Sequence, residues 1–233
     1  MDKAGLKIDW ATHKAAKYAC ENWHYSKTMP VNKTVKMGVW EYGIYKGCVV
    51  YSCGSAGVRS INKTYGIKKG CVVELARVAL RDHIFPVSKI VALTLKILKR
   101  TQKNIRLVVS YADPQQDHVG VIYQSMNWIY IGRSSKDFVF IDTIGKRWHS
   151  RSVSESGWKV HCGVRRKCPK PSSMTRVSIP PKYKYLYPLD AAMREQILPL
   201  SKPYPKRAVS IENDAPAIQQ DEGGVIPTTA LHE

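Results

Sequence analysis

Apolar and polar residues alternate along the first half of the chain at two different periods. In residues 11–23, ATHKAAKYACENW, the apolar side chains recur at helical spacing, so this segment predicts a first helix. Residues 36–54 contain two strand-like runs around a turn near YGIYKG and predict a β-hairpin. Residues 56–70 are basic and contain glycine, and we interpret them as a connection.

The next segments alternate strands with helices. The β-branched run 71–80 predicts a buried strand, and the apolar residues between Ile90 and Leu98 share one face of a helix over 88–100. The remaining segments of this part are, in order, a buried strand at 105–114, a short helix followed by an aromatic strand at 117–134, and a hairpin at 136–152.

The helix at 88–100 begins directly after a strand and Pro86. Its first turn points unpaired N–H groups outward, and the helix dipole favours an anion there. We therefore expect Val87, Ser88 and Lys89 to bind a phosphate group, with Lys89 adding a positive charge. The alternative is a core helix that Ser88 caps and that binds nothing.

The charge of the chain indicates that this globular domain has an anionic partner. The 233 residues include 37 Lys and Arg against 18 Asp and Glu, a formal charge of +19. Residues 209–233 hold five of the acids and no Lys or Arg, so residues 1–208 carry +24. This excess is typical of proteins that bind nucleic acid. Solubility alone is the alternative explanation.

Composition divides the chain into three parts. We expect a catalytic domain at 1–150, a basic extension rich in Pro and Tyr at 151–207, and a disordered acidic tail at 208–233. The extension should pack on the domain through extended segments and one short helix at 189–198, and should contact DNA. The candidate DNA-binding residues are Arg165, Arg166, Lys167, Lys182 and Lys184.

Nothing in the sequence indicates a membrane. No run approaches 18 consecutive apolar residues, and the N-terminal segment lacks the apolar region of a signal peptide. We therefore expect a soluble intracellular protein whose six cysteines are reduced thiols. The oligomeric state is left open, a homodimer being one alternative.

The order of elements resembles the GNAT acyltransferase fold. WEYGIYKGCVV is similar to its second and third strands, VVELARVAL to its fourth, and YQSMNWIYIG to its Tyr-containing helix and aromatic strand. The resemblance implies an α/β (α+β) fold with a mixed central sheet flanked by helices. It also implies an acetyl-CoA or related CoA donor, whose pyrophosphate would lie at Val87, Ser88 and Lys89.

A narrower resemblance rests on five motifs in order across residues 6–190. LKIDWATHKAAKYACENWHYSKTMP, ELARVAL, VSYADP, YQSMNWIYIG and KYKYLYPLD are similar to the Mom family of phage DNA-modification proteins. The resemblance implies an enzyme that converts adenine in double-stranded DNA to carbamoylmethyl-adenine at the exocyclic amine and so protects the DNA from restriction. It further implies iron, an acetyl-CoA link and the host cell cytoplasm.

Two short stretches are candidates for chemistry near a metal. His24 and Tyr25 lie in a loop after a helix, and imidazole with phenolate suits iron. The alternative is an aromatic cluster packed under the hairpin. Asp113 follows a buried strand and is a candidate general base, or a third metal ligand with His24 and Tyr25. Its alternative role is to begin a turn before Pro114.

Three further residues complete the candidate catalytic set. Ser110 precedes Asp113 at the carboxyl end of the strand, where GNAT folds open the acceptor site. Tyr123 lies where GNAT enzymes often place a Tyr that protonates a thiolate; a core aromatic is the alternative. Arg77 interrupts an apolar strand and needs a partner, which could be phosphate, a substrate carboxylate or Glu74.

Two other functions remain open at this point. One is a CoA-dependent N-acetyltransferase that acts on a protein or a small molecule. The other is a non-enzymatic DNA-binding protein, for which Asp113 would be dispensable.

Overall fold

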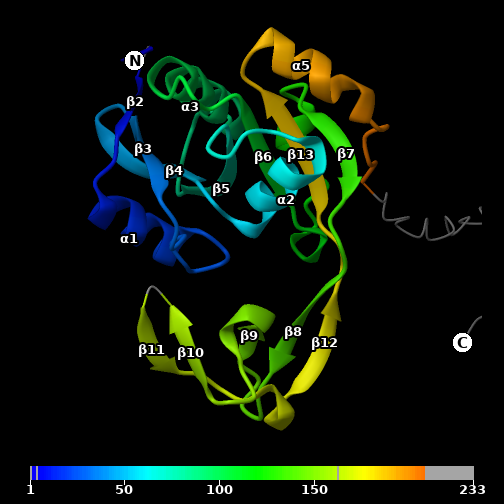
Figure 1. Cartoon of the computed structure of the whole chain (residues 1–233). Helices are drawn as coiled ribbons and strands as arrows, with labels where there is room; N and C mark the ends of the chain where they lie inside the picture. Colours follow the sequence, from blue (N-terminus) through cyan, green and yellow to red (C-terminus); the bar gives the residue numbers. More distant parts are fainter. Residues whose placement is uncertain (1, 4, 162, 208–233) are drawn as a thin grey trace, which may run out of the picture.

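The computed structural model describes residues 2–3, 5–161 and 163–207. The acidic tail expected at 208–233 lies outside the described residues. An eight-stranded mixed sheet forms the centre of the molecule, in the order β1-β2-β3-β4-β5-β6-β13-β7 (Figure 1). Its strands are β1 (Asp2–Lys3), β2 (Leu6–Trp10), β3 (Thr34–Glu41), β4 (Ile44–Ser52), β5 (Val72–Leu80), β6 (Leu107–Ala112), β7 (Ile129–Arg133) and β13 (Tyr183–Pro188).

Helices cover both faces of this sheet. Strand β4 shows the division, since Val49 and Tyr51 pack with α3 while Cys48 and Val50 pack with α1 on the opposite face. The helices are α1 (His13–Trp23), α2 (Ala56–Tyr65), α3 (Val87–Thr101), α4 (Val121–Gln124) and α5 (Ala191–Ile197). None of them, within the described ranges, is long and apolar enough to cross a bilayer.

The helix α2 lies where the sequence indicated only a connection. Ser55 accepts a hydrogen bond from the Val58 N–H at its start, and Gly66 in a left-handed conformation ends it. Within residues 57–65 of this short helix only Val58 and Ile61 are buried, so its apolar pattern is weak against the surrounding lysines. Strand β2 was not predicted either.

The predicted fold class is confirmed. Strands β5 and β6 are the parallel pair of the sheet, and their pairing stops after Glu74 and Val109. A bulge in β5 lies at the same level, because Val50 pairs with Arg77 while Tyr51 pairs with Leu75. Beyond these residues the two strands part. This opening between central parallel strands is the feature that the GNAT resemblance predicts.

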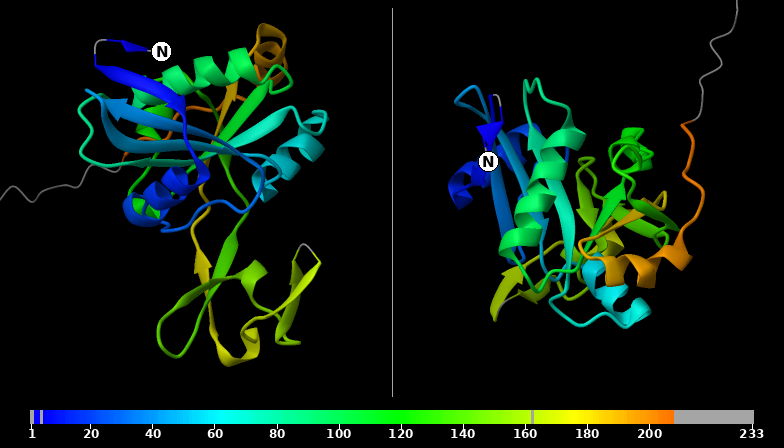
Figure 2. Two further views of the ribbon diagram at one scale, coloured as in Figure 1. Left: turned by 90° about the vertical axis from the view of Figure 1, so that its left-hand side faces the viewer. Right: turned by 90° about the horizontal axis from the view of Figure 1, so that it is seen from above.

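An insertion, residues 134–182, lies between β7 and β13. It contains a three-stranded sheet in the order β12-β8-β9 and a separate two-stranded ribbon of β10 and β11. In Figures 1 and 2 the insertion projects from the main domain, to which β8 and β12 connect it. Its strands are β8 (Asp137–Ile141), β9 (Arg147–His149), β10 (Trp158–His161), β11 (Val164–Lys167) and β12 (Thr175–Ile179).

The domain boundary therefore differs from the predicted one at residue 150. The insertion begins earlier, and β13 returns to the centre of the main sheet, between β6 and β7. Tyr185 is fully buried there. Because β13 carries Lys184 between its tyrosines and ends with Pro188, its composition resembled an exposed extension. The expected short helix at 189–198 is present as α5.

Candidate active site at the opening of β5 and β6

A cavity of about 730 Å³ opens where β5 and β6 part. One wall is the outer part of β5, from Leu75 to Leu80, and another is the segment from Gln116 to Tyr123. Residues 23–25, at the end of α1 and directly after it, also line the cavity. Further lining residues are His83 before α3, Val87 at its start, Tyr111 and Ala112 of β6, and Arg207. The volume is within the usual range for small-molecule sites.

Tyr123 and Ser110 form a hydrogen-bonded pair at the root of the opening. The Ser110 Oγ lies 2.8 Å from the Tyr123 Oη and 3.0 Å from the Leu75 carbonyl oxygen. A carbonyl can only accept, so when Ser110 donates to Leu75 its oxygen accepts the Tyr123 proton. Ser110 thus bridges the two strands at the point where their backbone pairing ends, and it orients the phenol.

Burial keeps Tyr123 protonated. It raises the pKa of Tyr123 to about 12, against a smaller opposing effect of the Ser110 hydrogen bond. The phenol can therefore serve as a proton donor at neutral pH. Tyr123 also packs on Trp128 and Tyr185, as the core alternative expects, and it lines the cavity as well; its catalytic role stays a prediction.

His24 lies in the cavity wall as a neutral imidazole. Its Nδ1 accepts a hydrogen bond from the Ser26 N–H at 3.1 Å, which leaves the ring proton on Nε2. Burial, followed by the positive charge of Arg77, lowers the pKa of His24 to about 4. The Tyr25 ring lies 4.3 Å from the His24 ring, centroid to centroid.

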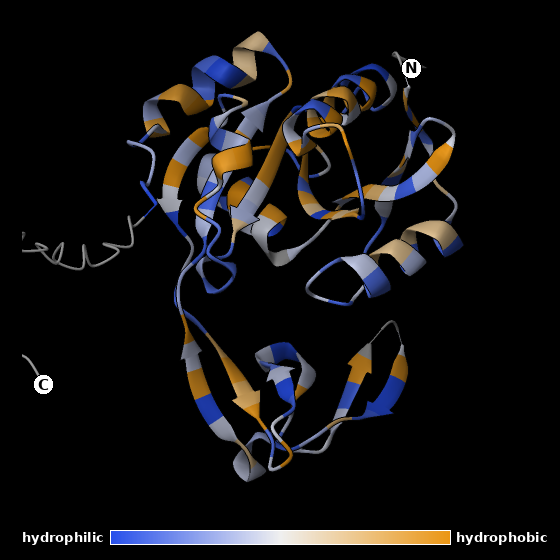
Figure 3. Ribbon diagram, turned by 180° about the vertical axis from the view of Figure 1, so that it is seen from behind, coloured by the Kyte–Doolittle hydropathy of each residue, from blue (hydrophilic) through white to orange (hydrophobic). Residues whose placement is uncertain are grey.

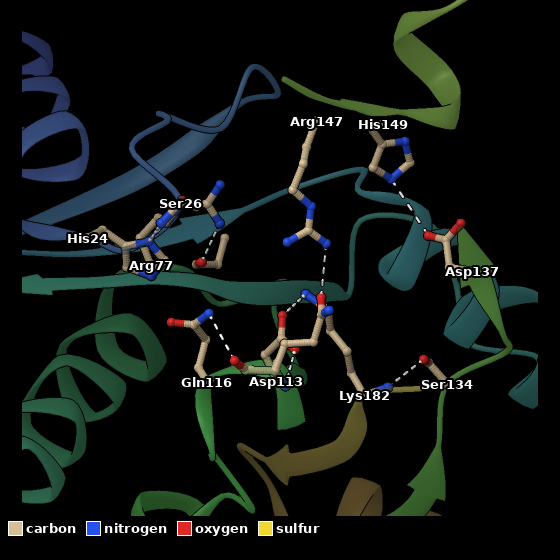
Figure 4. A network of polar contacts seen from close by, with 12 residues as sticks. His24, Ser26, Arg77, Asp113, Gln116, Ser134, Asp137, Arg147, His149 and Lys182 are labelled. Carbon is tan, nitrogen blue, oxygen red and sulfur yellow. Dashed lines mark hydrogen bonds and ion pairs between the residues drawn. The ribbon is translucent and has the colours of Figure 1, made fainter. Parts of the chain in front are cut away.

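Asp113 is engaged in structural contacts (Figure 4). Its Oδ2 lies 2.7 Å from the Lys182 Nζ, and its Oδ1 accepts the Gln115 N–H at 3.0 Å. The carboxylate therefore begins a turn, as one of the two sequence interpretations proposed. Asp113 is only 7% exposed and lies beside the cavity.

The predicted iron ligands do not fit a metal centre. Asp113 already pairs with Lys182, and the His24 Nδ1 already accepts a backbone N–H. In the part of the chain that the structure describes, no group of three or more His, Cys, Asp or Glu side chains could hold a metal ion. We derive no step through iron.

Arg77 holds the loop after α1 against the bulge of β5. Its Nε and Nη2 donate to the Thr28 carbonyl and hydroxyl at 2.9 and 3.2 Å, and its Nη1 donates to the Ala76 carbonyl at 2.7 Å. Among the described residues no carboxylate lies within ion-pair distance, so the partner is not Glu74 as one alternative had it. Its positive charge faces the cavity without a counter-ion.

The N-terminus of α3 supports part of the expected donor site. Pro86 precedes the helix and makes no side-chain cap, so Ser88 does not fill that role. The N–H groups of Val87, Ser88 and Lys89 have no acceptor among the described residues and fit a phosphate group. These residues would hold the pyrophosphate of a CoA donor, which supplies an activated thioester when bound.

The loop before α3 departs from a glycine-rich phosphate loop in one further respect. The fully buried Glu41 accepts the N–H groups of Ile84 and Phe85 at 2.7 and 2.9 Å. These two donors are therefore satisfied inside the protein. Contact with a donor phosphate is confined to the first turn of the helix.

The five predicted DNA-binding residues separate into two groups. Arg165, Arg166 and Lys167 are exposed on β11 of the insertion. Lys182 pairs with Asp113, and Lys184 lies half-buried in β13, where burial lowers its pKa. The last two are part of the main sheet and its connection, and contact of all five residues with DNA stays a prediction.

Tyr111, His118 and Arg207 are among the cavity-wall residues that lie outside the predicted set. Tyr111 and His118 flank the predicted Asp113, and their proximity to the VSYADP motif was the available signal. Arg207 had no local signal. It reaches the cavity because the segment before it packs on β7, where the Lys202 N–H donates to the Tyr130 carbonyl.

Comparison with known proteins agrees with the resemblance seen in the sequence. A family model described as the Mom protein family matches residues 5–206. A solved structure, FeeM, an N-acyl amino acid synthase from uncultured soil microbes, is similar with a TM-score of 0.41 and 10% sequence identity. The similarity covers 79% of this chain and 89% of that chain. No curated protein matches.

Proposed function

The chain belongs to the Mom protein family, and we propose that it transfers a small carbon unit to adenine in double-stranded phage DNA. The product is adenine with a carbamoylmethyl group on the exocyclic amine, which protects the DNA from host restriction. The observation that carries the proposal is the cavity at the opening of β5 and β6, with a protonated Tyr123 at its root.

The cavity suits a base that has left the duplex. The exocyclic amine of adenine lies inside the double helix, so an enzyme that acts on it must rotate the nucleotide out of the stack. Tyr25 is 49% exposed beside His24 and offers an aromatic surface for such a base. The Nε2–H of the neutral His24 is a hydrogen-bond donor for a ring nitrogen.

Charge around the cavity favours a nucleic-acid substrate. Arg77 and Arg207 line it against one acid, Asp117, and residues 1–208 carry an excess of +24. A phosphate next to the rotated nucleotide would compensate the charge of Arg77, which no carboxylate in the described ranges balances. Ser110 holds the Tyr123 phenol at the root of the cavity, so that it can give a proton to the group displaced from the donor.

A second candidate rests on the free N–H groups of α3. A CoA-dependent N-acetyltransferase for a protein or small molecule would use the same first turn at Val87, Ser88 and Lys89. It would turn over acetyl-CoA without DNA. A non-enzymatic DNA-binding protein would bind DNA and leave every base unchanged.

Mass analysis of nucleosides tests the three functions together. DNA from cells that express the full chain should contain deoxyadenosine heavier by one carbamoylmethyl group. DNA from cells that express Tyr123→Phe should not. Unmodified DNA from both, with acetyl-CoA hydrolysis or transfer in the absence of DNA, would support the acetyltransferase instead. Tight DNA binding with no altered nucleoside would support the third function.

A further inference from the structure

The ribbon of β10 and β11 stands apart from every other strand. It forms its own two-stranded sheet, with Trp158 opposite Lys167 at its base and His161 opposite Val164 near its tip. A two-stranded ribbon by itself is at best marginally stable in water. The stability of the ribbon therefore depends on the contacts at its base.

Hydrogen bonds fix the base of the ribbon and leave the rest projecting. The Lys159 Nζ donates to the Arg151 carbonyl at 2.6 Å. Below the first strand pair, the Cys168 N–H donates to the Gly157 carbonyl at 2.9 Å, and the Ser154 N–H to the Pro169 carbonyl at 3.0 Å. The four strand pairs beyond this base extend about 10 Å, at roughly 3.3 Å per residue.

The ribbon exposes side chains that a stable surface would normally cover. Trp158, Val160 and Val164 are 43%, 70% and 52% exposed, and every residue of β11 is exposed. Arg165 lies with its guanidinium 4.7 Å from the Trp158 ring centre. One face of the ribbon thus combines Trp158 and Val160 with a preoriented guanidinium, while Val164 lies on the other face. Figure 3 shows the hydrophilic run that follows along β11.

The charge of the insertion points to a polyanion. Residues 134–182 contain eleven Lys and Arg against three acids. Two of these acids are engaged internally, because Asp137 lies 3.7 Å from His149 and Asp142 accepts the Trp148 indole N–H at 2.8 Å. The ribbon strands carry no acidic residue.

We propose that this ribbon enters the major groove of the DNA duplex and selects the base sequence beside the modified adenine. The proposal rests on the proposed DNA-modifying function. The major groove is about 12 Å wide and 8.5 Å deep and admits a two-stranded ribbon. Arg165 can bind a guanine edge, and Val160, which is paired with it on the same face, can contact a thymine methyl group. Arg166 lies on the opposite face of the ribbon and can contact a phosphate.

The observations favour DNA over a second copy of this chain. If two ribbons paired edge to edge, the basic residues of one copy would lie beside those of the other, and like-charge repulsion disfavours such a pair. These residues are Lys159, Arg165, Arg166 and Lys167. The minor groove, at about 6 Å, is too narrow for two strands about 4.8 Å apart with side chains on both faces.

The insertion is joined to the active-site edge of the main domain. Lys182 pairs with Asp113 after β6, and the Arg147 Nη2 donates to the Gln115 Oε1 at 3.3 Å (Figure 4). Gln115 directly precedes Gln116, which lines the cavity. DNA held by the ribbon would therefore lie near the cavity that receives the adenine.

Dimethyl sulfate probing of protein–DNA complexes tests the proposal, since the reagent methylates guanine N7 in the major groove and adenine N3 in the minor groove. The full chain should protect guanine N7 beside the modified adenine. The variant Arg165→Ala/Arg166→Ala should lose this protection. Its preference for the modified sequence over an unrelated duplex should fall roughly 10- to 100-fold per lost guanine contact.

A matched control removes charge elsewhere. Lys96 and Arg100 are exposed on the C-terminal half of α3, on the main domain, and their replacement by Ala removes the same number of charges but should leave the N7 protection and the sequence preference unchanged. Both variants change exposed residues, so their melting temperatures should match the parent within a few degrees, which verifies folding.

Three results would overturn the proposal: unchanged N7 protection in the ribbon variant, protection confined to adenine N3, or a change of oligomeric state with unaltered DNA contacts. Failure of the proposed function gives a different result, because the nucleosides would then be unmodified whether or not the ribbon protects guanine N7. The two readouts are independent.

Discussion

The Asp113 Oδ2 lies 2.7 Å from the Lys182 Nζ, and this ion pair joins the end of β6 to the point where the insertion returns to the main sheet. The Asp113 side chain is 9% exposed and that of Lys182 36%. Ser134, where the insertion begins, exchanges hydrogen bonds with Lys182, since its N–H donates to the Lys182 carbonyl and its Oγ accepts the Lys182 N–H. Lys182 therefore binds both the end of β6, through Asp113, and the residue where the insertion begins, Ser134.

Replacing Lys182 by Met should lower the free energy of unfolding by about 1–3 kcal/mol, because it leaves the buried Asp113 charge without its partner. Asp113→Asn should also destabilise the protein, and the double variant should be more stable than the sum of the single losses predicts. Denaturant unfolding of the four proteins measures this coupling. Strictly additive losses would show that the pair contributes nothing.

Local patterns predicted the parts of the fold that depend on neighbours in sequence. The apolar run around Cys48 and Val50 indicated one strand of a hairpin, and in the structure this strand, β4, is buried on both faces. The partner of Asp113 could not be found this way. Lys182 is 69 positions further along the chain, and only the return of β13 beside β6 brings it near.

In the candidate site, too, the sequence patterns identified single residues but not the contacts between them. Tyr123 and Ser110 were identified singly from the motifs that contain them, but their mutual hydrogen bond depends on how α4 packs against the opening of the sheet. Nothing in the local sequence indicated that Glu41 supports the site, because it does so by accepting two backbone N–H groups more than 40 residues away.

Tyr123→Phe should abolish DNA modification while changing the melting temperature by only a few degrees. The ring remains to pack on Trp128 and Tyr185, and only the proton donor is lost. Ser110→Ala should lower the rate less, since the phenol stays but loses its orientation. Nucleoside mass analysis and thermal unfolding measure the two effects.

Tyr187→Phe provides the control for this experiment. Tyr187 packs on the same Trp128 from β13, and no hydrogen bond to its hydroxyl is found in the described structure. Its replacement should leave modification at the parental level. Modification by Tyr123→Phe at the parental rate would exclude Tyr123 as the proton donor.

The buried His24 should make the protein less stable in mild acid. Its pKa is about 4 in the folded protein against 6.5 in the unfolded chain, so the unfolded state binds more protons between these values. The contribution is fully present above about pH 6.5 and is lost as the pH falls toward 4. Its upper limit is about 3 kcal/mol, at 1.36 kcal/mol per pKa unit.

Denaturant unfolding of the parent and of His24→Gln at pH 7.5, 6.0 and 5.0 tests this expectation. Glutamine does not titrate, so the variant should lose less stability than the parent between pH 7.5 and 5.0. Parallel pH dependence of parent and His24→Gln would contradict the assigned pKa.

Gly120→Ala should damage both stability and activity, because Gly120 sets the start of α4 and hence the position of Tyr123. Gly120 has a φ of +91°, and an added Cβ would lie 2.4–2.7 Å from three atoms of the Tyr185 ring. Tyr185 cannot move aside. It is fully buried, and its hydroxyl donates to the Val119 carbonyl and accepts from the Gln124 amide.

Gly43→Ala separates the two effects. Gly43 has a φ of +80°, but nothing lies within 4 Å of its added Cβ. This variant should cost only the left-handed backbone strain, about 1–2 kcal/mol, and should retain full modification. Gly120→Ala should cost about 1–3 kcal/mol more because of the clash, and should lose modification even where it remains folded. Equal losses in the two variants would show that Tyr185 yields and that α4 is not held by this contact.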